Sequence, residues 1–189
     1  MSKDEKSEEK KDMEPKDAEG LVKYFKDEFK TKIKSAEIKK RTAGSKKIEF
    51  INIWMKIDRS IFKDVIKHLV DYQFPHLAVV SCNDLGDTIE LIYHFSVNFG
   101  TRLNEISLNI SVEVPKSKPE IETICDWIPG ALVTEREKQE MMGVKIIGIP
   151  DSRRLFLPDD FPEGVYPWRK DKQPGLEKLI RNLHDGDKI

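Results

Sequence analysis

The fold is decided by two stretches, residues 89–97, which read IELIYHFSV, and residues 106–114, which read ISLNISVEV. Apolar and polar residues alternate in both stretches, and this period of two is typical of a β-strand with one buried face. Asn98-Phe99-Gly100-Thr101 links the two stretches. The two stretches therefore predict an antiparallel pair with one face on a core and a wetter opposite face.

The residues before this pair predict alternating helices and strands. The predicted elements are an apolar helical stripe from Ala18 to Ile33, a short strand starting at Ile38, a strand over 48–57, a helix capped by Asp58 or Ser60 with its stripe over 62–70, and a short, largely buried strand over 76–82. This order predicts an α+β fold with a mixed, mainly antiparallel sheet and helices packed on one side.

The residues after the pair predict shorter elements. Ser117 and Glu120 have the spacing of a capping box, which predicts a third helix that Pro129-Gly130 breaks. Thr134 and Glu137 predict the cap of a further short helix that Gly143 stops. A last helix is expected from the stripe of Leu176, Leu179, Ile180 and Leu183. We expect three regions: a disordered charged tail over 1–16, an α+β domain over 17–126, and an extended docking segment with a short C-terminal helix over 127–189.

Composition excludes some classes of function. The chain has 189 residues, of which 35% are charged, yet the net charge is only −1, so no basic field would attract nucleic acid or anionic lipid. A nucleic-acid-binding α+β domain is a weaker alternative, because no aromatic-rich stretch supports it. Lys and Glu dominate the charges and Gln is rare, a bias reported for hyperthermophile proteins. A hot-growing prokaryote, such as an archaeon, is the expected source.

No cofactor, metal or catalytic site is predicted within this chain. Its two cysteines, Cys82 and Cys125, are far apart in the sequence and form no C-x-x-C pair, so they predict two buried, reduced thiols in a cytoplasmic protein. The four histidines lack ligand spacing, and no phosphate loop or catalytic triad occurs. No apolar run approaches the ~20 residues of a membrane span, and the charged N-terminus is no signal peptide. Any membrane association is expected through partners only.

Residues 127–171 have a different character from the rest of the chain. Charged residues alternate with glycines and prolines there, and little of the stretch beyond Gly143 has the period of a helix or a strand. Such a segment cannot satisfy its backbone within a ladder of its own, so it must lie on a surface. Arg136 and Glu140 fall on one helical face. Further carboxylate partners for Arg136 are expected to come from elsewhere, which suits an interface.

An ordered set of residues in this stretch resembles a known family. The set is Glu135-Arg136-Glu137, Glu140, Gly143, Pro150-Asp151, Arg153-Arg154-Leu155, Pro167 and Arg169-Lys170-Asp171. The order resembles the 30 kDa subunit family of complex I. Three positions depart from the family pattern, with Ile149 for a His, Trp168 for a Leu and Glu140 for an Asp. Because the His is missing, no role of that imidazole carries over.

The resemblance implies a cofactor-free subunit in the peripheral arm of a complex I-like oxidoreductase, on the cytoplasmic side of the cell membrane. Such a subunit docks on and stabilises a catalytic large subunit related to that of [NiFe]-hydrogenases, near iron–sulfur subunits. The [NiFe] centre and the iron–sulfur clusters are therefore expected in partner subunits. The residues expected to carry the docking are Trp127, Glu135, Arg136, Glu137, Arg153, Arg154, Trp168, Arg169, Lys170 and Asp171. We expect their charges to be unpaired, or paired with water, in the free chain.

The resemblance leaves the particular complex open. The compact length, the missing His and the composition favour a ferredoxin-dependent, hydrogen-evolving and ion-pumping membrane-bound hydrogenase. The same role in an NADH or ferredoxin dehydrogenase, or in a membrane-bound sulfane sulfur reductase, remains an alternative. Trp127 fits ordinary core packing as well as it fits an interface anchor.

Overall fold

The computed structural model describes residues 17–101, 104–171 and 179. The predicted tail over 1–16 lies outside them, and so does the predicted last helix apart from Leu179. The elements are α2 (Ala18–Phe29), η1 (Lys30–Lys32), β1 (Ile33–Ala43), β2 (Ile48–Ile57), η2 (Arg59–Ile61), α3 (Phe62–Tyr72), β3 (His76–Asp84), β4 (Thr88–Val97), β5 (Ile106–Pro115), β6 (Glu120–Glu122), α4 (Ala131–Met142) and β7 (Lys145–Ile147).

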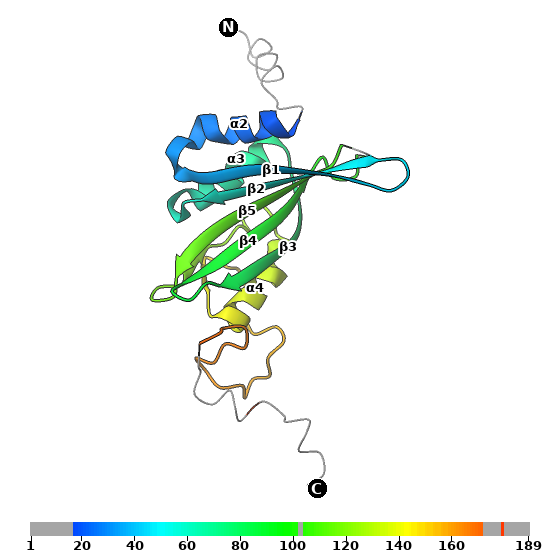
Figure 1. Ribbon diagram of the computed structural model, residues 1–189. Coiled ribbons are helices and arrows are strands. Elements are labelled where there is room, and N and C mark those ends of the chain that lie inside the picture. Colours follow the sequence, from blue (N-terminus) through cyan, green and yellow to red (C-terminus); the bar gives the residue numbers. More distant parts are fainter. Residues whose placement is uncertain (1–16, 102–103, 172–178, 180–189) are drawn as a thin grey trace.

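Five strands form one sheet in the order β1-β2-β5-β4-β3 (Figure 1). The two alternating stretches are β4 and β5, and they pair antiparallel, with Tyr93 opposite Ile110. The β2 strand joins β5 in parallel, while the other neighbours are antiparallel. The structure thus confirms the predicted α+β class with a mixed, mainly antiparallel sheet.

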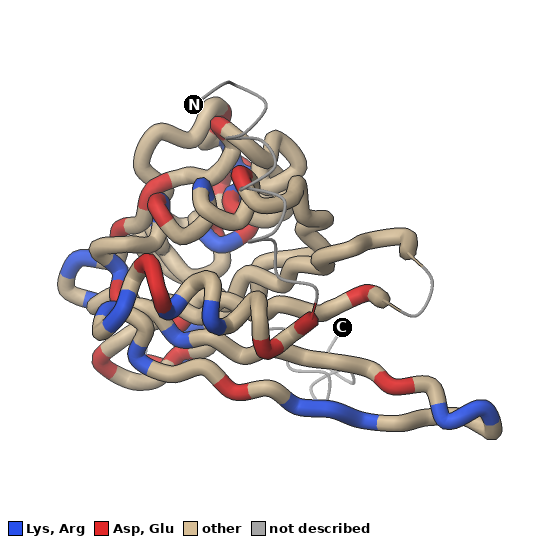
Figure 2. The backbone as a smooth tube through the Cα atoms, turned by 90° about the horizontal axis from the view of Figure 1, so that it is seen from above, with Lys and Arg blue, Asp and Glu red and all other residues tan. Residues whose placement is uncertain are grey.

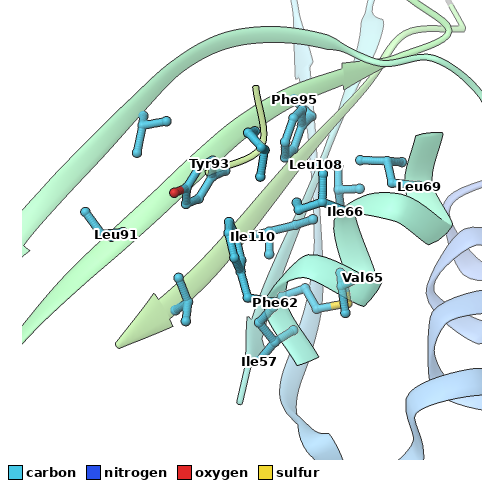
Figure 3. Close-up of a cluster of buried hydrophobic side chains, with 14 of the residues drawn as sticks. Ile57, Phe62, Val65, Ile66, Leu69, Leu91, Tyr93, Phe95, Leu108 and Ile110 are labelled. Atoms are coloured by element: carbon cyan, nitrogen blue, oxygen red, sulfur yellow. The ribbon is translucent and has the colours of Figure 1, made fainter. Parts of the chain in front are cut away.

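One apolar core lies between this sheet and the helices α2 and α3 (Figure 1). The stripe of α3 faces the inward side chains of β4 and β5, as Figure 3 shows for Ile66, Leu69, Phe95 and Leu108. Phe62 and Tyr93 meet with their ring centroids 4.8 Å apart. Burying each such side chain contributes roughly 1.5–3 kcal/mol, so this layer fixes the sheet on which the C-terminal region is built.

Three predicted details of the N-terminal half were wrong. The predicted helical stripe ended too late, because α2 ends at Phe29 and Ile33 already begins β1. The β1 strand is longer than predicted, because its charged residues pair in register with the whole of β2. The β3 strand is not largely buried, because it lies at the edge of the sheet, where only Val80 and Asp84 are buried.

The predicted helix from Ser117 was also wrong. Residues 120–122 form β6, which pairs in parallel with β7, and Glu120 forms ion pairs with Lys118 and Lys145 instead of completing a capping box. A parallel pair needs a crossover, and α4 supplies it. These long-range partners cannot be recognised from the local residue pattern.

The helix α4 differs from the prediction at its start and agrees at its end. It begins at Ala131 with Gly130 at the N-cap and no side-chain cap. Thr134 lies inside the helix, and its hydroxyl accepts from the Val80 amide, 3.0 Å away, which covers the free edge of β3. Gly143 ends the helix with a φ of 66°, as predicted, in the left-handed region that glycine adopts without strain.

Beyond β7, the described chain forms a strap, defined here as residues 148–171. It contains no helix or strand and lies below α4 in Figure 1, at the opposite end of the molecule from α2. Backbone polar groups in such a segment need partners outside a ladder, and Arg136, Glu140, Asp151 and Arg154 supply several of them.

Candidate docking site

Glu135 is the most deeply placed residue of the motif. It lies on α4 with an exposed fraction of 0%. Its carboxylate accepts from the Thr123 hydroxyl at 2.6 Å, the Ile124 amide at 3.0 Å and the Cys125 thiol at 3.4 Å. Burial raises the pKa of Glu135, and these hydrogen bonds offset part of that rise. The residue therefore joins α4 to the loop after β6.

Arg136 holds the strap from one face of α4. Its guanidinium donates to the carbonyl oxygens of Arg153 and Arg154, at 2.8 Å each, and lies 3.4 Å from the Asp151 carboxylate. All three partners belong to the strap. Arg136 thus satisfies two backbone carbonyls that have no ladder of their own.

Glu140, one helical turn further, holds the same part of the strap. Its carboxylate accepts from the backbone amides of Leu155 at 2.9 Å and Phe156 at 2.7 Å, and from that of Leu157 at 3.4 Å. Arg136 and Glu140 lie on one helical face, as predicted from their spacing. Together they bind carbonyls and amides of consecutive strap residues.

The end of α4 binds the last part of the strap. The Tyr166 ring lies so close to Gly143 that a Cβ atom there would be 2.4 Å from it. The Arg169 guanidinium lies 4.4 Å from the centroid of the same Tyr166 ring and donates to the Met142 carbonyl at 2.8 Å. Gly143 is therefore required both for its backbone conformation and for the space that Tyr166 fills.

Lys170 and Asp171 attach the strap to the main sheet. The Asp84 carboxylate, with a side-chain exposed fraction of 1%, accepts from Lys116 Nζ and from the Lys170 backbone amide, at 2.8 Å each. Lys116 also donates to Asp171 at 2.6 Å. Burial alone would raise the pKa of Asp84, but hydrogen bonds from Lys116, Lys170 and Gly86 outweigh it and hold the pKa well below its usual range.

These contacts contradict the expectation that the motif charges are unpaired in the free chain. The expectation failed because the strap lacks a ladder, so its backbone groups recruit the charged side chains. Glu137 pairs with Lys138, whose Nζ also lies 4.8 Å from the centroid of the Trp168 ring. Arg153 pairs with Asp151 at 2.8 Å. Arg154 donates to the carbonyl of Pro158. Trp127 is partly buried and packs against the core.

Among its exposed residues, the strap carries two large aromatic side chains. Phe156 has an exposed fraction of 62% and Trp168 one of 45%. Trp168 was among the predicted docking residues, but Phe156 was not. The one sequence signal for it is the apolar run from Leu155 to Leu157 inside a segment that cannot form a core. Exposed aromatic side chains on a fixed backbone are typical anchors of protein interfaces.

The described part of the chain contains no group of three His, Cys, Asp or Glu side chains that could hold a metal ion. The same residues include no helix that is long and apolar enough to cross a membrane.

We predict that Arg136→Ala lowers the stability of the chain by about 2 kcal/mol, because charge-assisted hydrogen bonds to two carbonyls are lost. Protection of the strap amides against hydrogen exchange should fall, while the amides of β4 and β5 stay protected. Lys23→Ala, at an exposed position on α2, is the control and should change neither quantity. Unchanged exchange of the strap in the Arg136 variant would contradict this role.

We predict that Asp84 makes the attachment of the strap sensitive to acid. Its pKa is lowered by folding, so its contribution to stability is present above its ordinary value of 3.8 and is lost as the pH falls through the folded value. Asp84→Asn should cost about 1–2 kcal/mol at pH 7 and should weaken the dependence of stability on pH below pH ~4. Urea unfolding at several pH values measures the loss at pH 7 and the pH dependence. If stability falls equally with pH in wild type and in Asp84→Asn, the role given to Asp84 is contradicted.

Comparisons with known proteins agree with this geometry. A family model described as the 30 kDa subunit of respiratory-chain NADH dehydrogenase matches residues 55–177, which include most of the sheet, α4 and the strap. The match covers more than half of the chain. The chain belongs to this family, and the resemblance seen in the sequence is confirmed.

Two relatives illustrate the range of the family. The membrane-bound hydrogenase subunit beta of Pyrococcus furiosus is 37% identical over 131 residues, which cover 69% of this chain and 75% of that protein. A subunit of the F(420)H(2) dehydrogenase of Methanosarcina mazei is 32% identical over 136 residues, which cover 70% of this chain and 83% of that protein. Both are named as subunits of larger enzymes.

A solved structure shares the fold. A chain of the membrane-bound sulfane sulfur reductase, described as an archaeal respiratory membrane complex, superposes with a TM-score of 0.66. The match covers 87% of this chain and 92% of that chain at 22% sequence identity, so it supports the fold and not a particular activity.

Proposed function

We propose that this chain is a cofactor-free, non-catalytic subunit in the peripheral arm of a complex I-like membrane oxidoreductase, on the cytoplasmic side of the membrane. It docks on the catalytic large subunit, one related to the [NiFe]-hydrogenase large subunit, beside iron–sulfur subunits of the same complex. Those partners carry the [NiFe] centre and the clusters, and the membrane is reached through partners only. Family membership and the names of the relatives support this proposal.

The observation that carries the proposal is the construction of the strap. In-chain hydrogen bonds from Arg136, Glu140, Arg169 and Lys170 hold its backbone in one shape. A free chain gains little from fixing a segment that buries few apolar groups. A docking surface gains more, because a pre-ordered segment loses less conformational entropy on binding.

The roles of the predicted docking residues divide into two groups. Trp168 and the exposed parts of Arg153, Lys170 and Asp171 can meet a partner directly. Glu135, Arg136, Glu137, Arg154, Arg169 and Trp127 are held by in-chain contacts and act by shaping the surface. Phe156 joins the first group.

The complex is proposed to be a ferredoxin-dependent, hydrogen-evolving and ion-pumping hydrogenase, supported by the relative from Pyrococcus furiosus. The name of the relative from Methanosarcina mazei supports a dehydrogenase as the alternative. A sulfane sulfur reductase stays the further alternative that the sequence resemblance left open.

Purification of the tagged chain from native membranes tests the proposal. The expected result is recovery of a large subunit and iron–sulfur subunits in amounts equal to that of the tagged chain. The presence of nickel in the recovered complex would indicate a hydrogenase, and its absence one of the alternatives. Recovery of the chain alone under mild detergent, or of a complex without a large subunit, would overturn the proposed function.

A further inference from the structure

The hairpin of β1 and β2 extends beyond the main sheet. The first β2 residue that pairs with β5 is Ile51, opposite Ile106. Residues 41–50 lie further out and pair only with one another, with Arg41 opposite Phe50 and Ala43 opposite Ile48. In Figure 1 this part projects sideways from the body as a two-stranded ribbon. Two strands without a third strand or a helix beneath them have little stability of their own.

This projecting part and the two residues before it are strongly basic. Five cations, Lys39, Lys40, Arg41, Lys46 and Lys47, lie within nine consecutive residues of a chain whose net charge is −1. Figure 2 shows them along the outer β1 strand and at the turn. We call residues 39–50 the basic hairpin.

Among the residues that the structure describes, ion pairs use two of these cations. Lys39 lies 3.3 Å from Glu37, and Lys40 lies 2.9 Å from Glu19 on α2. Within the described residues, Arg41, Lys46 and Lys47 have no carboxylate partner. Lysines on an edge strand such as β1 can serve to prevent unwanted strand pairing. The two turn lysines lie outside both strands, so this role does not account for them.

The cations point in several directions. Successive residues of a strand face opposite sides of a sheet, so Lys39 and Arg41 share one face and Lys40 the other. The ion pair of Lys40 with α2 marks its face as the helix side. Lys46 and Lys47 lie at the tip. The basic hairpin is therefore charged on both faces and at its end.

We propose that the basic hairpin is a second docking point, which inserts into a carboxylate-lined recess on a neighbouring protein subunit. This inference rests on the proposed function, because it assigns a further contact within the same complex. A flat anionic membrane could meet only one face of the hairpin at a time, whereas a recess meets both faces and the tip. Glu49 on the hairpin and Glu37 beside it oppose binding to a phosphate backbone but are compatible with a mixed protein surface.

The test compares two charge-matched variants. The first carries Arg41→Gln, Lys46→Gln and Lys47→Gln in the basic hairpin. The control carries Lys23→Gln, Lys26→Gln and Lys67→Gln, which neutralises three exposed lysines on α2 and α3. Both variants lower the net charge by the same amount, so an effect of overall charge cancels.

The probe is the remainder of the complex, purified by a tag on its large subunit from cells that lack this chain. We expect the hairpin variant to bind it at least tenfold more slowly than wild type at 50 mM NaCl, with the difference shrinking at 500 mM, because salt screens exposed charges. The control should match wild type at both concentrations. A zero-length carbodiimide should couple Lys46 or Lys47 to an Asp or Glu of another subunit.

Equal binding of the hairpin variant and wild type at both salt concentrations would overturn the inference and leave the proposed function intact. Absence of binding by wild type would contradict the proposed function itself. Phosphatidylglycerol vesicles and duplex DNA serve as further probes. If wild type and the control bind one of these probes and the hairpin variant does not, that result would overturn the inference of a protein recess in favour of that probe as the ligand.

Discussion

Glu135→Ala is expected to lower the free energy of unfolding by about 3 kcal/mol, because it leaves buried donors unsatisfied and opens a cavity. The Ile124 amide and the Thr123 hydroxyl would lose their acceptor in a place that water does not reach. In a domain of this size, such a loss lowers the melting temperature by roughly 6–12 °C. Calorimetry or urea unfolding of the purified chain measures it.

Glu122→Ala is the matched control for Glu135, since this carboxylate is exposed on β6 nearby. Its effect should stay within about 0.5 kcal/mol. An equally small effect at Glu135 would contradict the view that this residue holds α4 to the loop after β6.

Glu135→Gln separates charge from hydrogen bonding. Because folding raises the pKa of Glu135, its contribution to stability is greatest below its ordinary pKa of 4.5 and is lost as the pH rises through the folded value. The Gln variant keeps one acceptor oxygen and cannot ionise. Its stability relative to wild type should therefore improve as the pH rises from ~4 toward 7.

Local pattern was sufficient for the inner strands β2, β4 and β5 and for α3. Each of these elements has a pattern that indicates one buried face: the alternation in β4 and β5, the run over 48–57 and the stripe of α3. The fold forms when these faces pack against each other. The sequence left Asp58 and Ser60 open as the cap of the next helix. The structure has Asp58, which accepts from the Ser60 amide at the start of η2, whereas α3 itself has no side-chain cap.

Local pattern failed where the partners are distant in sequence. The stretch from Ser117 resembles a helix start, yet its residues 120–122 pair with β7 and the loop after them is held by a carboxylate from α4. Glu135, Arg136 and Glu137 were predicted to be docking residues whose charges are unpaired, or paired with water, in the free chain. Only the fold reveals that the first is buried, the second binds the strap and the third neutralises a buried lysine.

The docking roles of the motif residues stay a prediction, although the stretch that forms the strap was recognised from the sequence. The residues that carry the resemblance include those that hold the strap backbone. Particular charged groups are needed at these positions, because they bind particular backbone groups of the strap. The resemblance did not mark Phe156, whose side chain contacts solvent and whose backbone amide alone enters the hydrogen-bond network.

Phe156→Ser is expected to weaken binding to the large subunit at least tenfold while leaving the fold unchanged. The side chain is largely exposed in the free chain, so its replacement should change stability by no more than about 0.5 kcal/mol. Burying a phenylalanine in an interface contributes ~2 kcal/mol or more, and each ~1.4 kcal/mol is a factor of ten in affinity. Glu140 still binds the backbone of the strap in this variant.

Phe74→Ser is the matched control for Phe156. Phe74 lies between α3 and β3, away from the strap, and its exposed fraction of 63% nearly equals the 62% of Phe156. The two substitutions remove the same exposed apolar group, so only its position differs. Binding of the Phe74 variant should equal that of wild type.

The most direct measurement is the dissociation constant between each purified variant and the large subunit with its iron–sulfur partners, determined beside its melting temperature. The account predicts that Phe74→Ser and Phe156→Ser have the melting temperature of wild type. It predicts that the affinity falls at least tenfold in Phe156→Ser and stays that of wild type in Phe74→Ser. Equal affinity of the Phe156 variant and wild type would contradict the claim that the strap is the docking surface.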